Sequence, residues 1–105
     1  MSQTKSKEEL TRLAWLAALR REGHRKCAGV YFKPTSGRVC ALGLLIEVVE
    51  PEGNRMLHYA DVVGARAGLS AKQTGEVLRR NDGTFGCSRY SFAEIADMVE
   101  GWFKP

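Results

Sequence analysis

The chain has 105 residues and a mass of 11.6 kDa, which is enough for one domain with one hydrophobic core. Its hydrophobic fraction of 44% and charged fraction of 27% are ordinary for a globular protein and exclude wholesale disorder. No apolar run approaches the roughly 18 residues that span a bilayer, and the polar start lacks the apolar stretch of a signal peptide. We therefore expect a cytoplasmic protein without membrane contact, forming a single domain over residues 1–105 with residues 1–6 disordered.

The first predicted helix covers residues 7–22, because Ser6 and Glu9 have the spacing of a capping box and Gly23 supplies a stop. Four apolar residues share the i, i+3, i+4, i+7 spacing of one helix face: Leu10, Leu13, Ala14 and Ala17. Three bulkier residues widen that stripe: Trp15, Leu16 and Leu19. We expect this helix to bury more than one face.

The next segments predict a hairpin followed by a buried central helix. Two short extended stretches flank a turn at residues 34–37, which indicates a small β-hairpin near residues 27–40. Residues 39–46 are almost continuously apolar, and periodicity over so short a run does not distinguish a buried strand from a buried helix. The Ala and Leu content and the stop at Pro51 favour a helix over residues 40–49.

Three further helices are predicted over residues 57–67, 71–80 and 91–103. The last two begin with the capping boxes Ser70–Gln73 and Ser91–Glu94, and residues 81–83 form a turn signal between them. The predicted fold class is mainly α, with about five short helices around one core and the hairpin near residues 27–40.

The net charge of +4 originates in the first third of the chain, where residues 1–38 hold nine basic and three acidic side chains. Such a cluster attracts phosphates or an acidic protein surface, although its cations can equally be solvated side chains around a packed aromatic residue. A helix-turn-helix built from residues 71–80 and 91–103 would need an unusually long loop of about ten residues. The candidate nucleic-acid-binding residues are Arg20, Arg21, Arg25, Lys26, Tyr31, Lys33 and Arg38.

Three cysteines, Cys27, Cys40 and Cys87, form no paired motif, which favours reduced thiols and gives no zinc half-site. If Cys40 begins the central helix, the helix N-terminus would lower the pKa of its thiol, and His58 could serve as the base of a thiol enzyme. The competing interpretation makes Cys40 a small core residue, and this is the one we adopt. We therefore predict no catalytic residue, cofactor or metal site.

Five segments, taken in order, carry a resemblance to a protein family. They are Trp15–Arg20, Cys40–Leu45, Gly68–Ser70, Asn81–Asp82 and Ser91–Asp97. Together they resemble a family of small uncharacterised proteins encoded by bacteriophages and their bacterial hosts, although Ala41 replaces the family's second cysteine and the loop before Ser91 is longer. The resemblance implies a phage or mobile-element setting and no established activity.

These observations predict a non-catalytic accessory protein that acts by contact with a protein partner. Nucleic-acid binding through the basic N-terminal helix and hairpin is the alternative, and a thiol enzyme based on Cys40 and His58 is the third interpretation. The sequence leaves the partner and the oligomeric state open.

Overall fold

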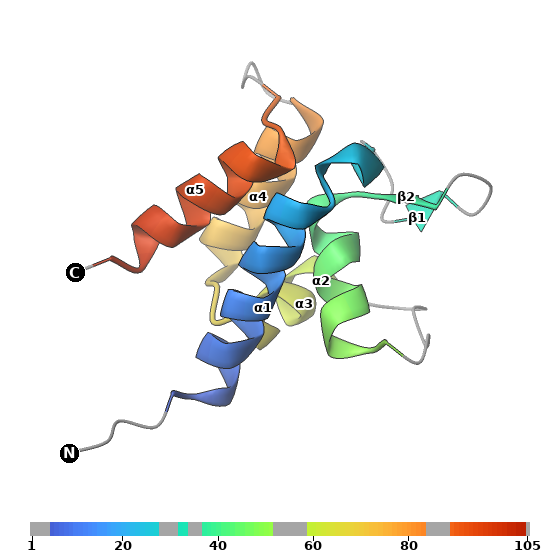
Figure 1. The fold of residues 1–105 in the computed structure, drawn as a ribbon. Coiled ribbons are helices and arrows are strands. Elements are labelled where there is room, and N and C mark those ends of the chain that lie inside the picture. Colours follow the sequence, from blue (N-terminus) through green and yellow to red (C-terminus); the bar gives the residue numbers. More distant parts are fainter. Residues whose placement is uncertain (1–4, 28–31, 34–36, 52–58, 84–88, 105) are drawn as a thin grey trace.

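The computed structural model describes residues 5–27, 32–33, 37–51, 59–83 and 89–104. Over these residues the chain is mainly helical, as predicted, and the helices pack around one core (Figure 1). The helices are α1 (Lys7–Arg21), α2 (Ala41–Val49), α3 (Ala60–Arg66), α4 (Ala71–Asp82) and α5 (Phe92–Trp102), with a 3-10 turn η1 at Gly23–Arg25. Among the described residues, no helix combines the length and apolar character needed to cross a membrane.

The predicted hairpin is confirmed as a ribbon of two short antiparallel strands, β1 (Phe32–Lys33) and β2 (Arg38–Val39). Phe32 pairs with Val39 and Lys33 pairs with Arg38. Since an isolated two-stranded ribbon is marginal in water, its attachment to the helices matters. The Cys27 amide supplies one attachment by donating to the Val39 carbonyl oxygen at 2.9 Å.

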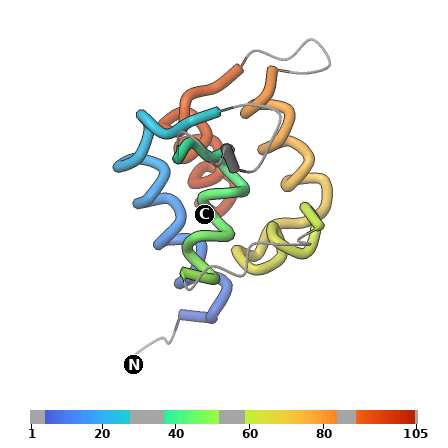
Figure 2. The backbone as a smooth tube through the Cα atoms, turned by 90° about the vertical axis from the view of Figure 1, so that its right-hand side faces the viewer, coloured from blue at the N-terminus to red at the C-terminus, as the bar shows by residue number. Residues whose placement is uncertain are grey.

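The apolar run that could have been strand or helix forms α2, at the centre of the molecule. Figure 2 shows α2 between α1 and α4, and all six residues from Ala41 to Ile46 are buried. A helix covered on several sides has no polar face, which is why its apolar residues show no amphipathic spacing. The prediction of a helix over residues 40–49 is confirmed, with Cys40 as the N-cap.

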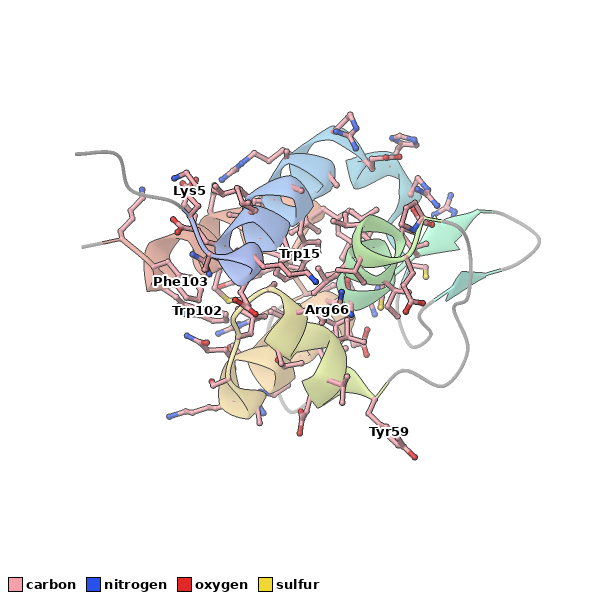
Figure 3. The ribbon with its side chains drawn as sticks, turned by 90° about the horizontal axis from the view of Figure 1, so that it is seen from below. Lys5, Trp15, Tyr59, Arg66, Trp102 and Phe103 are labelled. Carbon is pink, nitrogen blue, oxygen red and sulfur yellow. The ribbon has the colours of Figure 1, made fainter. Side chains whose placement is uncertain are left out.

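The helix α1 buries a different face from the one that its apolar spacing indicated. Its buried residues are Trp15, Leu16, Ala18 and Leu19. Trp15 lies among the helices in Figure 3, and its indole Nε1 donates to the Ala41 carbonyl oxygen at 2.9 Å. Larger side chains remove more apolar area from water, so the bulkier residues occupy the core. The stripe of Leu10, Leu13, Ala14 and Ala17 is exposed.

The helix starts follow the capping signals. The boxes Ser70–Gln73 and Ser91–Glu94 are both reciprocal, as predicted. At α1, Ser6 Oγ accepts from the Glu9 amide at 3.1 Å, while the Glu9 carboxylate lies 3.7 Å from Lys5 Nζ. Residues 1–4 lie outside the described part of the chain, and the expectation of disorder over residues 1–6 stays a prediction.

Two helix boundaries differ from the prediction by more than one residue. The helix α4 continues through Asn81 to Asp82, because the Asn81 side chain is buried rather than placed in a turn, and Gly83 then ends the helix at φ 72°. The helix α3 begins at Ala60 instead of residue 57, with Tyr59 as its N-cap, and residues 57 and 58 lie outside the described residues. A Cβ atom at Gly64 would overlap the Thr74 side chain, so glycine permits the close contact between α3 and α4.

Candidate functional site

The Cys40 thiol is buried and sits at the start of α2. Its relative exposure is 2%, and its Sγ accepts from the Gly43 amide at 3.4 Å. Burial raises the pKa of Cys40 to about 11, which opposes the lowering expected at a helix N-terminus. The thiol is therefore protonated at neutral pH in this conformation, and a reactive thiolate is disfavoured. His58, its proposed base, lies outside the described residues.

Arg25 is held in a partly buried ion pair. Its Nη1 and Nη2 donate to the two carboxylate oxygens of Glu47 at 2.9 and 2.8 Å, and its Nε donates to the Gly37 carbonyl oxygen at 2.9 Å. The hydrogen bond to Glu47 raises the pKa of Arg25. A bidentate ion pair of this kind fixes the orientation of both side chains. Arg25 thus fastens the segment after α1 to α2 and to the turn before β2.

The neighbouring arginines of α1 also meet carboxylates. Arg20 Nη1 donates to Asp97 Oδ1 at 2.7 Å, and Arg20 Nη2 lies 3.6 Å from Glu100 Oε1, so this side chain links α1 to α5. Arg21 lies 3.4 Å from the Glu22 carboxylate, with 67% of its side chain exposed. Surface pairs of this kind contribute little to stability, and they reduce the charge that the arginines present to a ligand.

Lys26 belongs to a buried polar junction around Asn81. Lys26 Nζ donates to the Asn81 carbonyl oxygen at 2.8 Å, and burial lowers the pKa of this lysine. The Asn81 side chain is fully buried; its Nδ2 donates to the Cys27 carbonyl oxygen at 2.9 Å, and its Oδ1 accepts from the Ala41 amide at 3.1 Å. One asparagine thereby joins α4, the start of α2 and the segment that leads to the hairpin.

Of the three remaining predicted nucleic-acid-binding residues, the structure describes the side chain of one. Arg38 is exposed on β2. Tyr31 and the side chain of Lys33 lie outside the described residues. Across the residues that the structure describes, no three His, Cys, Asp or Glu side chains gather as a metal ion would require. The most distinctive surface of the described chain is instead apolar.

We use the name α1 stripe for Leu10, Leu13, Ala14 and Ala17, all of which are exposed. The relative exposures of Leu10 and Leu13 are 55% and 44%. Figure 2 shows α1 along one edge of the molecule, and the exposure of these four residues shows that this face of α1 is open to solvent. A single exposed leucine is ordinary, but two leucines and two alanines on one face form a continuous apolar strip about two turns long. The sequence shows the spacing of these apolar residues, but it does not show whether this face of α1 points toward the core or toward solvent.

Two other apolar surfaces are less distinctive. Tyr59 and Val62 are exposed at 79% and 56%, and Figure 3 shows Tyr59 projecting away from the helices, next to residues that the structure does not describe. A groove of about 280 Å³ between α4 and α5 contains Met98 and Trp102. Its rim is polar, and Glu76 is paired there with Arg79 at 2.7 Å, an interaction that lowers the pKa of Glu76.

Comparisons with protein-family models, with curated proteins and with solved structures find no match to this chain. The resemblance to phage-encoded proteins therefore stays a prediction.

Proposed function

We propose that this chain is a non-catalytic protein-binding protein, of the phage-associated kind that its motif order resembles, and that the α1 stripe is its contact surface. The exposed apolar face of α1 is the observation that carries this proposal. Apolar surface of this kind gains free energy when a partner removes it from water. The buried thiol of Cys40, with its raised pKa, supports a non-catalytic role.

The nucleic-acid alternative has weaker support from the geometry. Phosphate binding depends on cations that are free to approach the backbone of the nucleic acid. Arg25 and Lys26 are engaged with Glu47 and with the Asn81 carbonyl, and Arg20 is engaged with Asp97. Releasing Arg25 and Lys26 would break contacts that join separate segments of the fold, and the surface pair of Arg20 reduces the charge that it presents to a ligand. We therefore favour protein contact over nucleic-acid binding.

The proposal is tested by capture of partners from cells that make the protein, with three forms of the chain as bait. The form Leu13→Glu places a charge in the middle of the α1 stripe, and Val62→Glu is the control, because Val62 is an exposed aliphatic residue on α3, away from the α1 stripe. We expect proteins that bind wild type and Val62→Glu to be depleted at least tenfold on Leu13→Glu, which corresponds to about 1.4 kcal/mol of binding free energy. Identical sets of proteins on all three baits would refute the proposal.

A further inference from the structure

Two cysteines that form no sequence motif lie on neighbouring backbone segments at the base of the hairpin. Lys26 and Val39 form a parallel bridge, and the Cys27 amide donates to the Val39 carbonyl oxygen at 2.9 Å. Because the two segments run in the same direction, the residue after Lys26 lies opposite the residue after Val39. These two residues are Cys27 and Cys40. The fold therefore pairs two cysteines that the sequence leaves unpaired.

The Asn81 side chain holds this register on its other side. In a regular parallel ladder, the next hydrogen bond would run from the Ala41 amide to the Cys27 carbonyl oxygen. The Asn81 carboxamide is inserted between these two groups, because its Oδ1 accepts from the Ala41 amide at 3.1 Å and its Nδ2 donates to the Cys27 carbonyl oxygen at 2.9 Å. The two segments are thus joined directly before the cysteine pair and through one buried carboxamide after it.

The spacing of the two segments suits a disulfide. Paired strands lie about 4.8 Å apart, and a disulfide accepts Cα separations of about 4.4–6.8 Å, which leaves about 2 Å for the widening that the Asn81 carboxamide causes. Opposite residues of a parallel pair direct their side chains to the same face. Burial raises the pKa of Cys40 most strongly and the Cys27 thiol raises it further, so the two thiols lie within electrostatic range of each other.

We propose that Cys27 and Cys40 form a reversible disulfide, which acts as a redox-sensitive lock at the base of the hairpin. The bond joins the two ends of the segment that contains β1 and β2, and closing this loop stabilises the folded chain by restricting the unfolded one. In a reducing compartment both thiols stay reduced, as they are in the structure. The lock uses no residue of the α1 stripe, so it is independent of the proposed function.

The oxidant is a small-molecule disulfide such as oxidised glutathione. Cys27 is the more exposed residue, at 7% against 2% for Cys40, so its thiolate attacks first, forms a mixed disulfide and releases one glutathione thiolate, which takes up a proton. Cys40 then loses its proton to solvent, attacks the Cys27 sulfur and releases the second glutathione thiolate, which is also protonated. Two protein thiols are oxidised and one glutathione disulfide is reduced to two thiols. Both steps need local opening and are slow, so the equilibrium is the quantity to measure.

Equilibration of the purified chain with reduced and oxidised glutathione tests the lock. The equilibrium is approached from both sides, from the reduced chain and from chain that is oxidised in urea and then refolded. We expect the equilibrium constant for the disulfide between Cys27 and Cys40 to be about 100-fold higher in the folded protein than in urea that unfolds it. Trypsin places the three cysteines in separate peptides, residues 27–38, 39–55 and 81–89, so mass spectrometry identifies the joined pair. Equal constants in the two conditions, or a folded protein that joins Cys87 instead, would overturn the proposal.

Thermal unfolding of Cys87→Ser provides a second measurement, because this variant keeps only the proposed pair of cysteines. Its oxidised form should melt about 10 °C above its reduced form. The matched control carries Cys40→Ser in addition, which leaves Cys27 as a single thiol and shows the effect of a glutathione adduct alone. An oxidised form that melts at or below the temperature of the reduced form would show that the disulfide does not fit the fold, and the lock would be rejected.

Discussion

Cys40 illustrates how burial outweighs the local backbone at a single residue. Its position as the N-cap of α2 places the thiol beside unpaired backbone N–H groups, and the Gly43 amide donates to its sulfur. These interactions favour the thiolate, but removal from water disfavours it more strongly, and the pKa rises to about 11. A cysteine at a helix start is therefore reactive only where solvent or a cation reaches it.

The raised pKa of Cys40 predicts a loss of stability in alkali. The folded pKa of about 11 lies above the ordinary value of 9.0, so the stabilisation is complete below pH 9 and is lost as the pH rises towards 11. Two pH units correspond to about 3 kcal/mol of unfolding free energy. At pH 11 the folded thiol is only half ionised, so about 2 kcal/mol of this is lost by then, and we expect wild type to lose about 2 kcal/mol more than Cys40→Ser between pH 8 and 11 in urea unfolding with a reductant present.

Serine is the matched control because it keeps an oxygen cap for the Gly43 amide and does not titrate in this range. Other groups that titrate in alkali are common to both proteins and cancel in the comparison. Parallel stability profiles for the two proteins would show that the Cys40 thiol is not held in its protonated form by the fold.

At the scale of an element, α1 has apolar residues on both its inner and outer faces. Periodicity therefore located the helix correctly but not its orientation. Trp15 and Leu19 are fully buried, whereas Leu10 and Leu13 are about half exposed. The face with Trp15 is the buried one because an indole ring removes more apolar area from water than an alanine does. Its N–H group also finds a partner in the core, the Ala41 carbonyl oxygen.

This orientation predicts unequal costs for the same substitution at two positions of α1. Leu19→Ala should lower the unfolding free energy by about 3 kcal/mol, because it leaves a cavity in the core. Leu13→Ala should change it by less than about 0.5 kcal/mol, because its side chain is already in contact with water. Urea unfolding of both variants provides the measurement. Equal losses would mean that α1 is rotated from the orientation described.

The starts of the helices were the most predictable elements. Ser70 and Ser91 act through atoms only three residues away, so their capping boxes depend on local sequence alone. The end of α4 was less predictable, since Asn81 and Asp82 commonly occur in turns. Here the Asn81 side chain has distant backbone partners, Cys27 and Ala41, that keep it in the helix.

At the scale of the whole molecule, a few side chains connect segments that are far apart in the sequence. Asn81 bonds to Cys27 and Ala41, Arg25 bonds to Glu47, and Arg12 lies over the Phe103 ring at 3.6 Å. Asn81 has the largest consequence for stability, because its partners are backbone groups of two buried residues and a buried polar group that loses its partner is costly.

The Asn81 junction predicts a large loss of stability on truncation. Asn81→Ala leaves the Ala41 amide and the Cys27 carbonyl without this partner, and we expect a loss of about 3 kcal/mol of unfolding free energy. Gln73→Ala on the same helix removes only an exposed capping bond and should cost less than about 1 kcal/mol. Thermal and urea unfolding of both variants provide the comparison. Similar losses of unfolding free energy for the two variants would show that the hydrogen bonds of Asn81 stabilise the fold no more than an exposed capping bond does.

The candidate site could be predicted from the sequence only in part. The cations Arg20, Arg25 and Lys26 were correctly located in one region of the chain, but their partners Asp97, Glu47 and Asn81 lie far along it. The four residues of the α1 stripe were identified as a face and assigned to the core. An apolar face looks the same in a sequence whether a helix of the same chain or a second molecule covers it.

The sequence by itself determined the approximate positions of the described helices and the starts of α1, α4 and α5, because caps and apolar spacing act over a few residues. Only the tertiary structure decided which face of α1 is buried, which cations are paired, and that the Cys40 thiol is removed from water. Those properties depend on neighbours that are distant in the chain, and burial is a property of the whole packed molecule rather than of any one segment.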